Sequence, residues 1–185
     1  LPALLEINGW RRRLCLATSL SINTQAYLDG LVNENKGIVN QLNHLNHYWE
    51  WSVNLIPRLQ DPSKATNFLQ NEWFSDAQKA NTIQAKKLYH HSLMVYYAIV
   101  DKNLEKALEI VDELIVILES HPEHIVEDLS AYLTLLNNKV GLLLDQKAYA
   151  AISEVLHKIR EAPAKYQIKE LTAGLEKIWK PMPVF

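Results

Sequence analysis

Apolar side chains recur every three or four residues along almost the whole chain, and little interrupts this pattern. The 185 residues include only 5 glycines and 7 prolines, so turns are few. The clearest stripe contains Leu104, Ala107, Leu108, Val111 and Leu114. No segment shows the alternation of apolar and polar residues that a half-buried strand requires. The sequence therefore predicts an all-helical protein with essentially no sheet.

Generic helix pairs are expected in residues 1–75. A first helix over residues 3–20 would bury a stripe made of Ile7, Trp10, Leu14 and Ala17. Residues 24–56 are predicted to form one long helix or two. Glycine inside a helix costs about 1 kcal/mol against alanine, so a bend or break is expected near Gly37.

The end of this segment is rich in aromatic residues and in signals for helix ends. Trp49 continues the apolar stripe and is predicted to lie in the core, whereas Trp51 points to another side of the helix and is expected to meet a second layer of helices. Pro57 is expected to end the helix. Asp61 would then cap a short helix that reaches about residue 70.

The remaining helices are predicted from residue 76 onward. A weak capping box at Ser75–Gln78 is expected to open a helix over about 76–100. The further helices start at Leu104, cover about 123–144 and 148–161, and end with a capping helix over 165–179. Short polar turns at 101–103 and 145–147 force the helices on either side to run antiparallel.

Two of these helix pairs look alike. In both, a short turn is followed by a large residue, Leu104 or Tyr149, and Ala107 or Ile152 stands three positions later, where only Ala107 is small. Residues 78–163 resemble tetratricopeptide-repeat proteins, including a class of bacterial helical-repeat proteins. The spacing from Leu104 to Tyr149 exceeds the 34 residues of that repeat, so the helices are expected to be longer.

The resemblance implies one domain over residues 1–185, in which antiparallel helix pairs stack as a short α-solenoid. In such a solenoid the first helix of each pair lines a concave binding surface. In that register the open side carries Tyr89, Ser92 and Tyr96 from one pair and Thr134, Asn137 and Asn138 from the next. Aromatic rings and amides suit an extended peptide. The alternative is that the helices of residues 1–75 bury both tyrosines.

Charge and cysteine content narrow the class of protein. The net charge is −2, and residues 101–145 alone hold 10 acidic against 3 basic side chains, so a nucleic-acid partner is not expected. Arg11, Arg12 and Arg13 point to three sides of a helix and form no single patch. The single cysteine requires no oxidising compartment, and no run of apolar residues is long enough for a membrane span. We expect a cytoplasmic protein, and a longer chain of which this sequence is part.

Histidines are the strongest hint of chemistry. His44, His47 and Glu50 lie along one helix face at a spacing that two metal ligands could share. A complete site would need further ligands from another helix, such as His90 and His91 or His121 and His124, so we expect no metal and no cofactor. Ordinary histidines hydrogen-bonded between helices are the simpler interpretation.

The sequence thus favours a non-enzymatic scaffold that binds a protein or peptide. One alternative is a sensor or oligomerisation domain of a larger regulatory protein. A second alternative is a helical bundle that binds a metal through the histidines. No motif of nucleotide binding, serine hydrolysis or metalloprotease chemistry occurs in the chain. The sequence sets neither the partner nor the oligomeric state.

Overall fold

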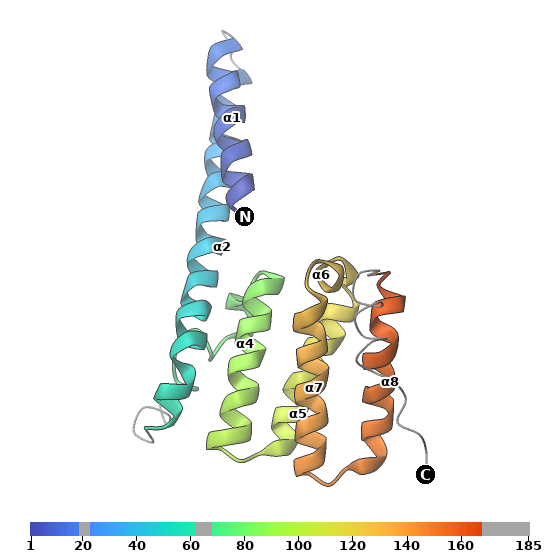
Figure 1. The fold of residues 1–185 in the computed structure, drawn as a ribbon. Coiled ribbons are helices and arrows are strands. Elements are labelled where there is room, and N and C mark those ends of the chain that lie inside the picture. Colours follow the sequence, from blue (N-terminus) through green and yellow to red (C-terminus); the bar gives the residue numbers. More distant parts are fainter. Residues whose placement is uncertain (19–22, 62–67, 168–185) are drawn as a thin grey trace.

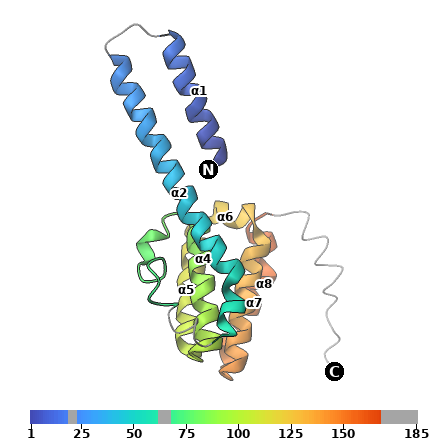
Figure 2. The same ribbon diagram turned by 90° about the vertical axis from the view of Figure 1, so that its left-hand side faces the viewer.

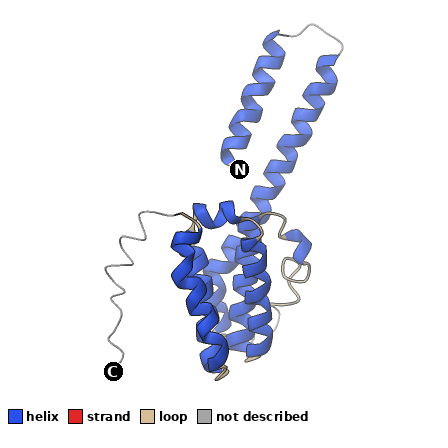
Figure 3. Ribbon diagram, turned by 90° about the vertical axis from the view of Figure 1, so that its right-hand side faces the viewer, coloured by secondary structure: helices blue, strands red, loops and turns tan. Residues whose placement is uncertain are grey.

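The computed structural model describes residues 1–18, 23–61 and 68–167, and these residues contain helices and turns without any strand (Figures 1 and 3). The all-helical prediction is therefore confirmed. In chain order the elements are α1 (Pro2–Thr18), α2 (Asn23–Leu59), the 3₁₀ helix η1 (Ala77–Lys79), α4 (Ile83–Val95), the π-helical turn η2 (Tyr96–Val100), α5 (Leu104–Glu119), α6 (Pro122–Glu127), α7 (Leu129–Asp145) and α8 (Tyr149–Lys165). The predicted short helix before residue 70 and the capping helix over 165–179 lie largely outside the described residues.

Two antiparallel helix pairs form the body of the molecule, as the short turns predicted. Helix α4 packs on α5, α7 packs on α8, and α5 joins the two pairs by packing on α7 (Figure 1). Each turn is closed by a lysine in the left-handed conformation, Lys102 at φ 54° and Lys147 at φ 58°. This conformation lets the next amide reach back, so that Asn103 N donates to Tyr97 O and Ala148 N donates to Leu143 O.

Helices α1 and α2 form a hairpin that rises away from this body (Figure 2). Helix α2 is one continuous element of 37 residues, about 55 Å long. The break expected near Gly37 is absent, because a helix interior tolerates a single glycine. The space beside Gly37 is open, so no close contact requires glycine at this position. Pro57 lies inside the last turn of α2 and does not end it.

The apolar stripe predicted for α1 faces outward. Ile7, Trp10 and Leu14 are all exposed, whereas Asn8 is fully buried against α2. The Asn8 side-chain amide donates to the carbonyl oxygen of Leu31 at 2.9 Å, and this polar contact sets the rotation of α1. The prediction for α1 was therefore right about the helix and wrong about its buried face.

A cluster of aromatic rings attaches the C-terminal half of α2 to the body. Tyr48 is completely buried, meets Phe74 and Tyr89 edge-on, and donates from its hydroxyl to the carbonyl oxygen of Trp73 at 2.8 Å. Burial raises the pKa of the Tyr48 phenol to about 12. Trp51 is half-buried and packs edge-on against Phe74, which lies in a turn, so a turn segment covers it and not the layer of helices that the sequence predicts.

This cluster also explains why Trp49 is not in the core. Adjacent residues of a helix point about 100° apart, so the burial of Tyr48 turns Trp49 outward. Trp49 is 62% exposed, which contradicts the sequence prediction.

Three helix boundaries differ from those predicted. Asp76 does cap a helix, but only the short η1, and α4 starts at Ile83 after Thr82 accepts a hydrogen bond from Ala85 N. The helix predicted over 123–144 is divided into α6 and α7, because Asp128 leaves the helical conformation and accepts a hydrogen bond from Ala131 N. Helix α8 continues through Pro163 to Lys165, with proline tolerated in the last turn.

A polar network connects α5, α7 and α8. Tyr132 on α7 donates to Glu119 on α5 at 2.7 Å, and Lys158 on α8 lies 3.2 Å from the same carboxylate oxygen. Burial by itself raises the pKa of Glu119, but the hydrogen bonds from Tyr132 and Lys158 outweigh it and hold the pKa below its usual value. The carboxylate therefore stays ionised and fixes how the three helices stack.

The crossing of α4 and α5 offers a direct test of core packing. Ala107 is completely buried, so we expect Ala107→Leu to force neighbouring side chains off their rotamers and lower the free energy of unfolding by about 1–3 kcal/mol. The matched control is Ala151→Leu on the exposed face of α8, with an expected change within about 0.5 kcal/mol. Urea denaturation followed by circular dichroism measures both, and a neutral Ala107→Leu would mean that the crossing is looser than described.

Candidate functional site

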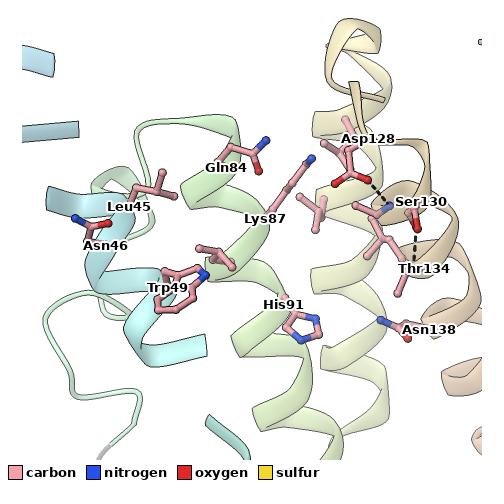
Figure 4. Close-up of a pocket in the computed structure, with 15 residues that line it drawn as sticks. Leu45, Asn46, Trp49, Gln84, Lys87, His91, Asp128, Ser130, Thr134 and Asn138 are labelled. Atoms are coloured by element: carbon pink, nitrogen blue, oxygen red, sulfur yellow. Dashed lines mark hydrogen bonds between the residues drawn. The ribbon is translucent and has the colours of Figure 1, made fainter. Parts of the chain in front are cut away.

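A groove of about 810 Å³ lies between α2, α4 and α7 (Figure 4). Its floor consists of Leu114 and Leu118 from α5, which are buried parts of the core. The groove exists because α7 packs on α5 and not on α4. The first helices of the two pairs are thereby left apart above an apolar base.

Two ring side chains from neighbouring helices line the groove. Trp49 on α2 and His91 on α4 both line it and are both exposed (Figure 4). Trp49 is there because Tyr48 occupies the core, so the aromatic cluster determines the shape of this wall. An exposed tryptophan beside an apolar floor offers a large contact area to a binding partner.

Two charged groups lie at the upper end of the groove, which is the end near the start of α7 (Figure 4). Lys87 from α4 lines it, and its Nζ is buried without a hydrogen-bond acceptor among the described residues. Asp128 also lines this end, but its carboxylate accepts the capping hydrogen bond from Ala131 N at 3.0 Å. A buried ammonium without an acceptor is costly, and an acceptor on a bound partner would satisfy it.

A second, smaller hollow continues the groove toward the turns. It has a volume of about 310 Å³ and is lined by Ala98 and Ile99 at the end of the first pair and by Asn137 and Gly141 on α7. Asn138 lines both hollows, so the two form one furrow along α7. The space beside Gly141 is open, so this residue borders the furrow without packing closely against a neighbouring helix.

The predicted binding residues are divided between the core and this furrow. Tyr89, Ser92 and Tyr96 are buried and do not face an open side. The alternative stated for the tyrosines is right about the region and wrong about the elements: Tyr89 stacks on Phe74 and Tyr96 stacks on Phe68, and both phenylalanines lie in turns of the segment that follows α2. Burial raises the pKa of both phenols.

The predicted binding residues on α7 do lie on an open side. Thr134 and Asn138 line the main groove, and Asn137 lines its continuation. The Thr134 hydroxyl donates to Ser130 O within its own helix at 2.9 Å. The sequence missed Trp49, Lys87 and His91, because their exposure depends on the rotation of α2 and on the gap between α4 and α7. The signal available was the pair of adjacent aromatic residues at 48 and 49, of which only one could be buried.

The two histidines named as possible metal ligands contact the side chain of Trp73. The rings of His44 and His47 lie on Trp73, with the His47 ring stacked at 4.5 Å between centroids. Nδ1 of His44 also lies 3.1 Å from the carbonyl oxygen of Lys79. Within the described residues, no three histidine, cysteine, aspartate or glutamate side chains gather as metal ligands would. The two histidines thus brace the segment that follows α2.

The acidic stretch predicted for residues 101–145 lies partly on the outer face of α5. Asp112 pairs with Lys139 and Glu109 pairs with Lys106. Glu113 lies 3.6 Å from Nε2 of His90, a buried residue whose Nδ1 is 2.8 Å from Lys86 O. These carboxylates behave as a solvated helix face with internal ion pairs.

Comparison of the chain with protein-family models, with curated proteins and with solved structures finds no match. In the part of the chain that the structure describes, no helix combines the length and apolar character of a membrane span. The function must therefore be inferred from the furrow and the surfaces themselves.

Lys87 provides a test of the groove by stability alone. Replacing it with methionine keeps the length of the side chain and removes a buried charge without an acceptor, so Lys87→Met should raise the free energy of unfolding by about 1 kcal/mol or more. Lys86→Met, at the neighbouring position, is the control and should change stability by less than about 0.5 kcal/mol. If Lys87→Met destabilises the protein in urea denaturation, the ammonium has an acceptor within the chain.

His90 predicts a pH dependence of stability. Burial lowers its pKa, although the Lys86 carbonyl and Glu113 oppose the shift. The unfolded chain then binds more protons than the folded one below the ordinary histidine pKa of about 6.5, so stability is lost as the pH falls through that value. One group accounts for at most about 1.4 kcal/mol per pH unit.

Urea denaturation at pH 7.5, 6.5 and 5.5 checks this sign. His90→Gln should show a shallower loss of stability than the wild type, whereas His157→Gln, at an exposed position on α8, should follow the wild type. Equal slopes for wild type and His90→Gln would contradict the assignment.

Proposed function

We propose that the protein is a non-catalytic binding module that holds a peptide segment of a partner protein in the furrow bordered by α2, α4 and α7. The observation that carries this proposal is the juxtaposition of exposed Trp49 with the apolar floor of Leu114 and Leu118. Bound segments are typically anchored by a few large side chains in a desolvated pocket, with tryptophan strongly represented among them. The surrounding amides and hydroxyls suit a peptide backbone, which needs both donors and acceptors.

The arrangement of the helices supports the same proposal. The furrow is bordered by the first helix of each pair, the side on which stacked helix pairs present their concave surface. A tetratricopeptide-like solenoid is the architecture that we propose for residues 78–163. Its unusually long helices give α7 a length of about 25 Å from 17 residues, enough for an extended peptide of about seven residues.

The two charged groups at the upper end of the groove indicate which kind of peptide segment would bind there. Lys87 lacks an acceptor, whereas Asp128 is already engaged in capping α7. A carboxylate or a backbone carbonyl of the partner placed beside Lys87 would remove the cost of the buried charge. We therefore expect a segment with an apolar side chain over Leu118 and an acceptor near Lys87.

Selection from a displayed random-peptide library on the immobilised protein tests the proposal, with binding of the selected peptides measured by fluorescence anisotropy. Trp49→Ala should weaken binding at least tenfold, because truncation removes an anchor at the rim. Asn138→Ala should weaken it less and leave stability nearly unchanged. Tyr149→Ala, an equally exposed aromatic position on α8, is the matched control and should bind as the wild type.

Two outcomes would overturn the proposal. The first is that no selected peptide binds with a Kd below about 100 μM. The second is that peptides bind Trp49→Ala and the wild type equally, which would place their site elsewhere.

A further inference from the structure

The outer face of α1 carries large apolar side chains that are largely exposed, although the Arg13 guanidinium lies over the Trp10 ring at 4.6 Å from its centroid. Leu4 is 48% exposed, Ile7 53%, Trp10 60% and Leu14 59%. They recur at the three- and four-residue spacing of one broad helix face, the face that the sequence predicts to be buried. Such a row of exposed apolar residues marks an interaction surface.

The inner face of α1 is the more polar one. Asn8 is fully buried and donates to Leu31 O and to Glu34, and Nε of Arg12 is buried without an acceptor among the described residues. Arg11 pairs with Glu34 across the same seam. Helix α1 therefore makes polar contacts with α2 beside the buried Leu31 and presents its apolar side to the outside, where that side is open to a further helix.

The charges that flank the apolar face identify this further helix. Glu6 lies in the first half of α1 and Arg13 in the second, seven residues apart and so on the same edge of the face. When a second α1 packs antiparallel on the first, Glu6 of each copy meets Arg13 of the other, and Leu4 of each copy meets Leu14. A parallel pair would instead place the arginine-rich halves together, and like charges repel.

We propose that α1 pairs antiparallel with α1 of a second copy, so that two hairpins form a homodimer about a twofold axis. The shape of the molecule permits this pairing. The hairpin stands clear of the body, and α1 begins at the end nearest the body (Figures 1 and 2). Antiparallel pairing therefore places the two bodies at opposite ends of the paired hairpins, where they do not collide.

The proposal commits to a second copy because the face is complementary to itself. A closed twofold interface presents the same patch from both subunits, with residue i meeting j and j meeting i. The contact is small, since a 17-residue helix offers one face about 25 Å long. It belongs to the range of interfaces that bury less than a standard area, so the dimer dissociates on dilution.

Sedimentation velocity of the whole chain from about 1 to 300 μM tests this inference. The wild type should shift from monomer to dimer across that range, with no larger species. Ile7→Glu places a charge at the centre of the face and should raise the dimer dissociation constant at least tenfold. Leu16→Glu is the matched control, because Leu16 is exposed on the same helix but lies off the face, and it should dimerise as the wild type. Circular dichroism of each variant confirms that the helices are retained.

Charge reversal distinguishes antiparallel pairing from other contacts. Glu6→Arg alone and Arg13→Glu alone should each weaken the dimer, and the double variant should restore it, because the opposite charges face each other again. A double variant that is weaker than both single variants would overturn the antiparallel arrangement. A wild type that stays monomeric at 300 μM would overturn the dimer.

A final experiment with lipid vesicles tests whether the apolar face of α1 binds a membrane surface instead. The wild type and Ile7→Glu should both fail to sediment with vesicles that contain one third anionic lipid. Binding of the wild type that Ile7→Glu abolishes would show that the face meets a membrane surface, which overturns the proposal. None of these measurements involves the furrow, so the proposed dimer and the proposed peptide binding can fail independently.

Discussion

The aromatic cluster around Tyr48, Phe74 and Tyr89 decides how the C-terminal half of α2, the segment after it and α4 are arranged. Its rings come from α2, from the segment after it and from α4, and the Tyr48 hydroxyl donates to the Trp73 carbonyl within it. Once Tyr48 is buried, the rotation of α2 is fixed and Trp49 must face the solvent side. The same cluster buries Tyr89 and so closes one face of α4 while leaving Lys87 and His91 on the other. The wall of the furrow is thus a consequence of core packing.

Helix α5 has the complementary part in the body. It packs on α4 at one side and on α7 at the other, and Leu114 and Leu118 span the gap between these two helices as the floor of the furrow. The Glu119–Tyr132–Lys158 network fixes the spacing of α5, α7 and α8. A rigid apolar floor with a buried ammonium at one end is a poor arrangement for stability alone.

The hairpin of α1 and α2 follows a different logic. Its seam is held by polar groups such as Asn8 and the Arg11–Glu34 pair, whereas Ile7, Trp10 and Leu14 point outward. One long helix, α2, belongs to both parts: its first half carries the hairpin, and its second half carries the wall of the furrow. Pairing of two hairpins would therefore hold two furrows at a fixed separation, which suits a partner with repeated binding segments.

The sequence by itself determined the helical class, the two antiparallel pairs and their turns, because apolar periodicity and short polar breaks are local signals. It also placed Thr134 and Asn138 correctly on an open side. Tertiary structure alone decided which of Tyr48 and Trp49 is buried, since both suit a core and only contact with Phe74 and Tyr89 distinguishes them. It alone decided that Tyr89 and Tyr96 lie inside, because the rings that cover them come from a segment with no periodic pattern. Tertiary structure also decided which face of α1 points outward. A helix with two faces that can pack is oriented by its partner, and the hydrogen bond from Asn8 to α2 turns the more polar face of α1 toward α2.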